Sequence, residues 1–449
     1  MPATPAPRRD RHRDQTTRSR DPATPQRGHG VNWHPGPLKY WLELNDSGTW
    51  GEDPVGTDDT AVVRSTDINL DGSWNIDDVA RRSLHPGEKI AKRLSRGDLV
   101  VVKSSGSADH LGKTAIVGSD VEALEACFSN FVQRLRPCGQ ADPRYVWYLL
   151  NSKKAASELQ LLGTTATGLR NLNGGIIGSV TFPGPRLAEQ RAIADFLDAE
   201  TARIDALIAS KERLASALAA RSQAITDRSM VPRQLGGVAD DGRDEWPVIK
   251  LKHIATYYTD GDWIETPYIT DDGIRLIQTG NIGPGRFKDQ GFRFISEPTF
   301  QELRCTEVFP GDVLISRLAG TLGQACVAPD LGTRMITAVD VVILRPTSWV
   351  DPEFLVMYLS TSRHLGVAEL NARGTTMLRL SRSQVGDMHA PLPPVDIQRQ
   401  AVWRVHRSLD AVNRVLDKLS SQLGLLRERR QALITSAVSG ELEGSGVAA

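Results

Sequence analysis

Two long stretches of the chain repeat apolar residues at alternating spacings of three and four. The first runs from Glu189 to about Met230 without Gly or Pro, and the second from Ile397 to about Val438 with Gly424 inside it. The first track is Ile193, Leu197, Glu200, Ile204, Leu207, Lys211, Leu214, Leu218, Arg221 and Ile225, and the second is Val402, Val405, Leu409, Val412, Leu416, Leu419, Leu423, Leu426, Arg430, Leu433 and Ala437. Heptad spacing of this kind is typical of a helix that packs along another helix. The sequence therefore predicts two long helices that pair with each other, the alternative being a coiled coil that joins two copies of the chain.

Short β-rich runs bounded by Gly, Asp and Ser precede each long helix. The predicted strands are 62–63, 99–102 and 114–117 ahead of the first long helix, and 276–277, 313–315 and 341–344 ahead of the second. Between them lie shorter helical stretches such as 143–151 and 352–361, with aromatic and aliphatic residues at helical spacing. Strands and helices mixed in this way predict an α+β class.

The same unit occurs twice in the chain. Residues 62–68 match 276–282, and the Gly-Asp pair at 97–98 matches the pair at 311–312, both at an offset of 214. The pair Gln190-Arg191 returns as Gln398-Arg399 at an offset of 208. Shared offsets that drift by only a few residues indicate two tandem copies of a unit of about 200 residues.

The duplication predicts how the chain is arranged. After the first long helix the chain folds a second domain and returns antiparallel, so we expect two tandem α/β domains separated by two antiparallel coiled-coil helices, with an approximate internal two-fold axis. The expected segments are a disordered basic tail at 1–30, a first domain at 31–185, a spacer helix at 186–230, a linker at 231–245, a second domain at 246–393, a second spacer helix at 394–440 and a tail at 441–449.

Composition excludes several classes of protein. No apolar run among the 449 residues approaches the roughly 18 that a membrane span needs. The first thirty residues hold seven Arg and no apolar run, so they do not form a secretory signal. The four cysteines, Cys127, Cys138, Cys305 and Cys326, include no C-x-x-C pair and are expected to be reduced thiols. We expect a cytoplasmic protein with no metal site.

Two related domains at a fixed separation suggest a ruler that reads two marks on a long partner, and double-stranded DNA is the leading candidate. The 54 basic residues equal the 54 acidic ones, so phosphate binding has to rest on local clusters. Residues 81–103 carry seven Lys or Arg against two acids, and residues 363–386 carry four Arg against one acid. Each domain is predicted to enter the major groove, where all four base pairs are distinguishable.

Candidate contacts lie in turns that combine small hydroxyl residues with a cation, since these groups suit phosphate oxygens and base edges. Two such turns follow predicted strands, at 103–107 and 317–321, and a Gly-Thr-Thr segment occurs once in each copy. The predicted DNA contacts are Lys103, Ser104, Ser105, Thr164, Thr165 and Arg170 in the first domain, and Arg317, Thr321, Thr375, Thr376, Arg379 and Arg382 in the second.

A further pattern stands at both ends of the long helices. Residues 185–198 read PRLAEQRAIADFLD, while the second copy reads LPPVDIQR at 392–399, RRQALI at 429–434 and SGEL at 439–442. This order of motifs resembles the two repeats of type I restriction-modification specificity subunits, and the resemblance covers the chain from about residue 31 onward. Two positions depart from the family pattern: Arg186 stands where a second Pro is usual, and Ile397 where an acid precedes Gln.

The resemblance implies a non-catalytic subunit with two target-recognition domains, each reading one half of a split, asymmetric DNA sequence. It also implies two modification subunits docked on the long helices and restriction subunits that join them. S-adenosylmethionine, ATP and Mg²⁺ are then expected only on those partners, with no cofactor on this chain.

Direct inspection for catalytic patterns agrees with a binding subunit. Neither Asn-Pro-Pro-Tyr nor Asp-Pro-Pro-Tyr occurs, and the segment ending in Gly112-Lys113-Thr114 has Ser107 where a phosphate-binding loop needs Gly. Residues 280–285 are predicted to form a turn rather than a dinucleotide-binding loop. Two alternatives remain open: a protein-protein scaffold without DNA readout, and an independent nuclease or ATPase, for which no catalytic constellation is found.

Overall fold

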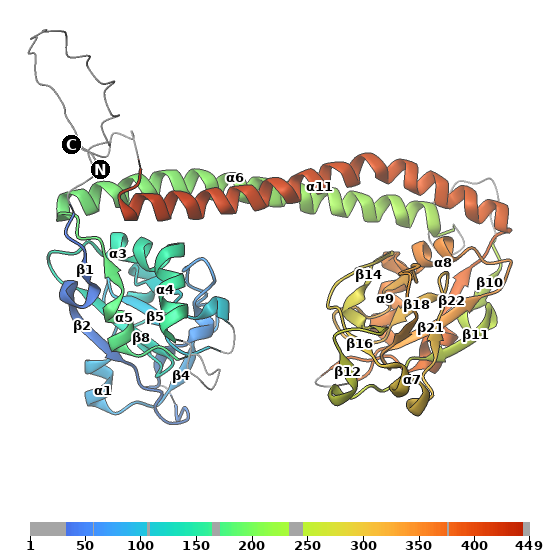
Figure 1. Cartoon of the computed structure of the whole chain (residues 1–449), viewed down its shortest axis with the longest axis horizontal. Helices are drawn as coiled ribbons and strands as arrows, with labels where there is room; N and C mark the ends of the chain where they lie inside the picture. Colours follow the sequence, from blue (N-terminus) through green and yellow to red (C-terminus); the bar gives the residue numbers. More distant parts are fainter. Residues whose placement is uncertain are drawn as a thin grey trace, which may run out of the picture. The chain divides into compact units, whose positions relative to one another are not determined.

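The computed structural model describes residues 33–56, 58–105, 108–163, 171–232, 246–374 and 377–442. Contacts divide the chain into unit 1, residues 1–204 with 428–449, and unit 2, residues 205–427. Both boundaries fall inside the long helices, so each unit contains one globular part and a section of each helix (Figure 1). The predicted tail at 1–30 and most of the predicted linker at 231–245 lie outside the described residues.

The globular part of unit 1 is built around a four-stranded antiparallel sheet. Its order is β2 (Leu42–Ser47), β8 (Val132–Pro137), β5 (Leu99–Val102) and β6 (Thr114–Ile116). All four residues of β5 are buried, as expected for an aliphatic run covered on both faces. Leu99 and Val101 pack against helices, whereas Val100 and Val102 pack against a second sheet, because alternate residues point to opposite faces.

Helices and a second sheet cover the two faces of this sheet. The helices are α3 (Pro143–Leu150), α4 (Lys153–Gly163) and α5 (Gly174–Ser179), and the second sheet is β4 (Ala80–Arg82), β3 (Thr60–Val63) and β7 (Cys127–Phe128), with β3 and β7 parallel. The connecting elements are β1 (Gly36–Pro37), η1 (Leu38–Trp41), η2 (Ser65–Asp67), α1 (Pro86–Ala91), η3 (Ala108–His110), α2 (Ser119–Ala123) and β9 (Thr181–Phe182).

Unit 2 repeats the four-stranded sheet and its three covering helices in the same chain order, and its second sheet has additional strands. Its four-stranded sheet is β11 (Ala255–Asp260), β21 (Val341–Pro346), β18 (Val313–Ser316) and β19 (Ala325–Val327), and its second sheet is β12 (Ile269–Thr270), β16 (Phe294–Ile295), β13 (Ile274–Ile277), β20 (Met335–Thr337) and β17 (Glu307–Val308). The other elements are β10 (Val248–Lys250), η5 (Leu251–His253), η6 (Thr266–Tyr268), η7 (Thr279–Asn281), β14 (Ile282–Gly283), β15 (Arg286–Phe287), α7 (Glu297–Leu303), α8 (Pro352–Leu359), α9 (Ser362–Asn371), α10 (Arg382–Asp387) and β22 (His389–Pro391). The predicted α+β class with a repeated unit is confirmed.

The repeated Gly-Asp pair has a structural explanation. Gly97 and Gly311 adopt positive φ values of 86° and 93°, which favour glycine, in the turns that lead into β5 and β18. The following carboxylates, Asp98 and Asp312, are buried and each accepts two hydrogen bonds from one arginine of the neighbouring strand. Arg136 donates to Asp98 at 2.6 and 2.7 Å, and Arg345 donates to Asp312 at 2.8 Å twice.

The two long helices are α6 (Leu187–Met230) and α11 (Val395–Ser439). Within unit 2 they run antiparallel: Met230 shares a core cluster with Val402 and Val405, whereas Lys211 Nζ donates to Gln422 Oε1 at 2.7 Å. Every position of the predicted α11 track is buried or half-buried. The sequence therefore located the contact face of α11 correctly.

The predicted track of α6 is wrong by one residue over part of its length. Leu207 and Leu214 are 51% and 49% exposed, whereas Ile208 and Ala215 are half-buried. The contact face of α6 continues from Ile204 to Ile208. Leu207 and Ile208 are both apolar, so their positions around the helix, and not their hydrophobicity, decide which of them is buried.

The far end of each long helix docks on the opposite copy of the repeat through the same pair of hydrogen bonds. In unit 2, the end of α6 contacts the segment after α8: Gln223 donates to the Ser360 carbonyl at 2.9 Å, and Asp227 accepts from the Ser362 amide at 2.8 Å. In unit 1, the end of α11 contacts the segment after α3: Gln431 donates to the Asn151 carbonyl at 2.8 Å, and the Thr435 hydroxyl accepts from the Lys153 amide at 3.2 Å. The repeat therefore extends to individual contacts.

A fully buried glutamine fastens the start of each long helix to the globular part. Gln190 Oε1 accepts from the Asp142 amide at 2.8 Å, while its Nε2 donates to the carbonyls of Pro185 and Gln140. Gln398 makes the same three contacts in unit 2, with the Asp351 amide at 2.8 Å, the Pro393 carbonyl at 2.7 Å and the Trp349 carbonyl at 3.1 Å. The repeated Gln-Arg pair thus marks a packing site.

Candidate nucleic-acid interface

In each unit a cation directly follows the same inner strand of the four-stranded sheet. Lys103 follows β5 and Arg317 follows β18. Each backbone carbonyl accepts from the segment between the helices that follow: the Leu172 amide donates to Lys103 at 2.7 Å, and the Leu380 amide donates to Arg317 at 2.9 Å. We call these places the strand-end sites of unit 1 and unit 2.

The strand-end site of unit 1 is lined by uncharged polar side chains. Lys103 Nζ donates to the Ser47 hydroxyl at 2.6 Å, and burial lowers the pKa of this lysine. Beside them Gln133 Nε2 donates to Asn45 Oδ1 at 2.7 Å, and Asn45 Nδ2 donates to the Gly174 carbonyl at 2.8 Å. Amide side chains of this kind offer both a donor and an acceptor, the pair that reads the edge of adenine.

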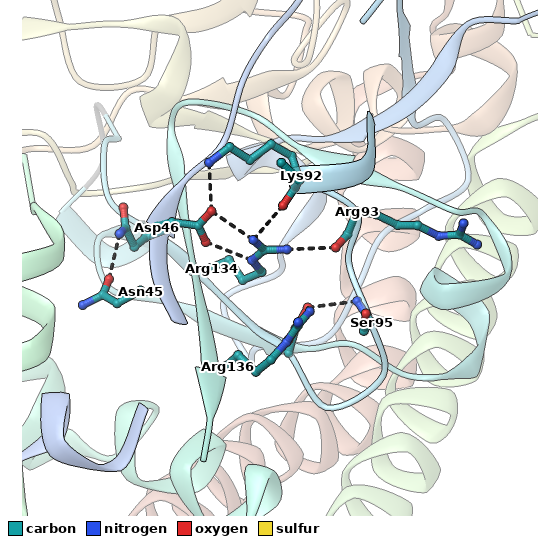
Figure 2. Close-up of polar contacts among 10 residues, drawn as sticks. Asn45, Asp46, Lys92, Arg93, Ser95, Arg134 and Arg136 are labelled. Atoms are coloured by element: carbon teal, nitrogen blue, oxygen red, sulfur yellow. Dashed lines mark hydrogen bonds and ion pairs between the residues drawn. The ribbon is translucent and has the colours of Figure 1, made fainter. Parts of the chain in front are cut away.

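Asp46, next to Asn45 on β2, holds a separate ionic network that shapes the unit. Arg134 donates to both of its carboxylate oxygens at 2.9 Å, and Lys92 donates at 2.8 Å (Figure 2). Burial would raise the pKa of Asp46, but these hydrogen bonds outweigh it and the pKa is lowered. Arg134 also donates to the carbonyls of Ala91 and Arg93, so the network fastens the end of α1 to β8.

Three of the seven bases in the run at 81–103 are neutralised by ion pairs. Arg82 pairs with Asp53, Lys92 with Asp46 and Arg93 with Glu125. The side chains of Lys89 and Arg81 donate to backbone carbonyls of residues 58 and 59. The folded unit therefore has fewer cations without an acidic partner than the sequence count suggests, because acids from other segments pack beside three of the bases.

Arg317, a predicted DNA contact, is turned inward in the strand-end site of unit 2. Its side chain is 7% exposed, and it donates to the carbonyls of Leu380, at 3.2 Å, and Val339. Its Nε lies 3.5 Å from Asp260 Oδ1. In this structure the guanidinium joins backbone segments and is not presented to solvent, and the DNA contact of Arg317 stays a prediction.

Arg379 and Arg382 are the accessible cations of the same site. Arg379 is 45% exposed at its side chain and pairs with Asp340 at 2.6 Å. Arg382 is exposed at the start of α10, and its carbonyl accepts from the Tyr258 hydroxyl at 2.8 Å. Thr321 is half-buried, with its hydroxyl 2.6 Å from that of Ser316.

The two strand-end sites have the same backbone arrangement but carry different side chains. The contact from Asn45 to the Gly174 carbonyl in unit 1 has its counterpart in the contact from Tyr258 to the Arg382 carbonyl in unit 2. The repeat likewise places Asp260 of unit 2 where unit 1 has Ser47. Burial raises the pKa of Asp260 although Arg317, Arg382 and Arg379 oppose the rise.

Several residues of these sites were missed by sequence reasoning, and several predicted ones lie outside the described structure. The sequence did not predict the following residues of these sites: Asn45, Gln133, Tyr258, Asp260 and Asp340. Some of them lie near the ends of β2 and β11, which occupy equivalent places in the two copies, and this equivalence could have indicated them. Ser104, the residue after Lys103, forms an isolated β-bridge with Asn171, and Ser105 is the next residue of the chain. The predicted contacts outside the described residues are Thr164, Thr165, Arg170, Thr375 and Thr376.

The described residues also bear on metal-binding, thiol and membrane-spanning features. The described residues contain no group of three or more His, Cys, Asp or Glu arranged to hold a metal ion. Burial raises the pKa of the Cys127 thiol to about 11 and of the Cys326 thiol to about 12, which disfavours their reactive thiolate forms. No helix within the described ranges has the length and apolar character needed to cross a membrane.

Comparison with known proteins places the chain beside one group. No protein-family model matches it. The specificity subunit of the type I restriction enzyme EcoKI from Escherichia coli K12 is 24% identical over 370 residues, covering 79% of this chain and 76% of that protein. The EcoBI specificity subunit from Escherichia coli is 22% identical over 301 residues, 62% of each chain.

Among solved structures, a chain from a study of complex assembly and conformational transition in the type I restriction-modification system matches with a TM-score of 0.62. The two share 17% identity, and the match covers 92% of this chain and 100% of that one. The resemblance inferred from the sequence motifs is confirmed: the chain is a relative of the type I restriction enzyme specificity subunits and shares a fold found in the type I restriction-modification system.

Proposed function

We propose that the chain is the DNA specificity subunit of a type I restriction-modification complex and reads a bipartite, asymmetric DNA site. The observation that carries this proposal is the pair of strand-end sites, which share one backbone scaffold but present different side chains. A repeated scaffold with divergent chemistry is what two half-sites of different sequence require. The exposed Asn45, held by the buried Gln133, suits an adenine edge, whereas Arg379 and Arg382 suit guanine or phosphate.

The long helices offer a surface for the partner subunits. Five large apolar side chains of unit 2 are between 42% and 64% exposed on these helices: Leu207, Leu214, Trp403, Val415 and Leu425. Apolar groups gathered on a helix pair favour a protein partner. We assign this surface to two modification subunits, with restriction subunits joining the complex, and we place S-adenosylmethionine, ATP and Mg²⁺ on those partners.

Replacing Arg379 with Ala is expected to weaken binding to the recognised DNA by about tenfold, because a base or phosphate contact is worth roughly 1 to 3 kcal/mol. The measurement is a titration of fluorescent duplex with the full chain. Arg404→Ala on α11 is the control, since this exposed arginine forms no ion pair with a described residue. An unchanged affinity and half-site preference in the Arg379 variant would remove this residue from the interface.

Lengthening both helices together is expected to lengthen the preferred gap between the half-sites. One heptad inserted after Ala215 and another after Leu419 adds about 10 Å of helix, or roughly three base pairs of duplex. Selection from a library of duplexes with varied gaps measures the change. A variant that keeps the original gap would contradict the ruler, and binding that does not weaken as salt rises would favour a protein scaffold instead.

A further inference from the structure

One segment differs in charge between the two copies although it occupies the same place in both. In unit 1 it spans residues 68–79, between η2 and β4, the antiparallel neighbour of β3. In unit 2 it spans residues 282–293, between η7 and β16, the antiparallel neighbour of β13. In unit 1 it holds three acids and no base, Asp71, Asp77 and Asp78. In unit 2 it holds three bases and one acid, Arg286, Lys288, Arg293 and Asp289.

The segment of unit 2 opens with a β-hairpin at 282–287, and we call the whole of residues 282–293 the hairpin. Ile282 pairs with Phe287 and Gly283 with Arg286, across a turn in which Gly285 has a φ of 75°. Asn281 fastens its second strand by donating to the carbonyls of Lys288, at 2.9 Å, and Gln290, at 2.7 Å. The hairpin is thus held in place before any partner arrives.

A buried arginine neutralises the only acid of this hairpin. Arg275 is 2% exposed, and its Nη2 donates to Asp289 Oδ1 at 3.2 Å and to the Gln290 carbonyl at 3.0 Å. Its guanidinium also lies 4.7 Å from the centre of the Phe292 ring and 5.4 Å from that of Phe294. Because a buried cation compensates Asp289, the outward charge of the hairpin comes from its three bases.

The three bases are not paired with acids. Arg286 and Arg293 are exposed, Lys288 is half-buried, and none of them forms an ion pair with a described residue. Arg286 and Lys288 are two residues apart in extended chain, so their side chains leave the same face. In the run at 81–103 of unit 1, by contrast, three of the seven bases form ion pairs with acids.

We propose that the hairpin at 282–293 is a phosphate-binding element through which unit 2 holds the backbone of double-stranded DNA next to its half-site. Preorganised, unpaired cations beside an exposed aromatic ring, Phe292 at 64%, fit a fixed row of anions. Unit 1 lacks this contact because its equivalent segment is acidic. The two halves of the site are therefore held with unequal electrostatic strength, and this inference rests on the DNA-reading function proposed above.

The test compares the full chain with the triple variant Arg286→Gln, Lys288→Gln, Arg293→Gln. Its affinity for duplexes with and without the recognised sequence is measured as salt is raised. Each lost phosphate contact lowers the slope of log affinity against log salt by about 0.9, so a drop of roughly two to three is expected. Both duplexes should bind at least about tenfold more weakly at low salt, since phosphate contacts carry no sequence information.

Two controls separate the outcomes. Lys153→Gln, Lys154→Gln, Lys418→Gln removes the same charge from exposed residues elsewhere and should leave the slope unchanged, whereas Arg286→Lys, Lys288→Arg, Arg293→Lys should retain it. A triple Gln variant with the parent's slope, or a control that loses as much, would overturn the hairpin assignment while leaving DNA reading intact. A parent chain that binds no duplex would overturn both.

Discussion

Replacing Gln398 with Leu is expected to lower the free energy of unfolding by about 3 kcal/mol. The side chain is fully buried, and its amide satisfies the Asp351 N–H and the carbonyls of Trp349 and Pro393. Leucine is similar in volume but leaves all three backbone groups without a partner, and each such group costs roughly 1 kcal/mol or more. Urea denaturation followed by circular dichroism measures the loss.

The same helix provides a matched control. Gln400 is exposed two residues further along α11, so Gln400→Leu should change the free energy of unfolding by less than about 0.5 kcal/mol. Gln190→Leu should reproduce the large loss in unit 1, where the contacts are equivalent. Equal, small effects of the substitutions at 398 and 400 would contradict the assigned role.

Acidification is expected to destabilise the chain through His364, by about 2 kcal/mol between pH 6.5 and pH 4.5. Burial lowers the pKa of this histidine to about 4, only partly opposed by the backbone of Gly323. Below pH 6.5 the unfolded chain binds a proton that the folded chain does not accept. The free energy of unfolding therefore falls as the pH drops from 6.5 toward 4, and little further loss from this group follows below that range.

His364→Gln isolates this contribution because glutamine does not titrate. The difference in free energy of unfolding between parent and variant should shrink as the pH is lowered from 7 to 4.5. Hydrogen exchange should place the parent's loss in unit 2, since the equivalent position in unit 1 is Ala155. A parent and a variant with parallel pH profiles would show that His364 is protonated equally in the folded and unfolded chain.

The two long helices begin with different contacts, which the sequence alone did not reveal. Glu189 accepts from the Arg186 amide at 2.8 Å at the start of α6. The equivalent of Arg186 in the second copy is Pro394, which has no N–H, so Ile397 stands where Glu189 would have had no donor to satisfy.

Strands, short helices and the repeat were predictable because hydrophobic pattern and local turn residues determine them. The track of α6 was not, since adjacent apolar residues such as Leu207 and Ile208 satisfy the pattern equally and only packing against α11 selects between them.

The candidate sites were less predictable than the fold. That a cation follows β18 is visible in the sequence, but the burial of Arg317 depends on carbonyls at Val339 and Leu380, from two other segments. Charge counting likewise missed the acids that neutralise residues 81–103, such as Asp46 and Glu125.

The most direct test of the proposed function is a map of adenine methylation in the source organism with and without this gene. Loss of one split, asymmetric methylated motif on deletion, restored by the intact gene, is the predicted result, and it would reveal both half-sites. An unchanged set of methylated motifs, in cells that make the complete complex, would contradict the assignment of DNA specificity to this chain.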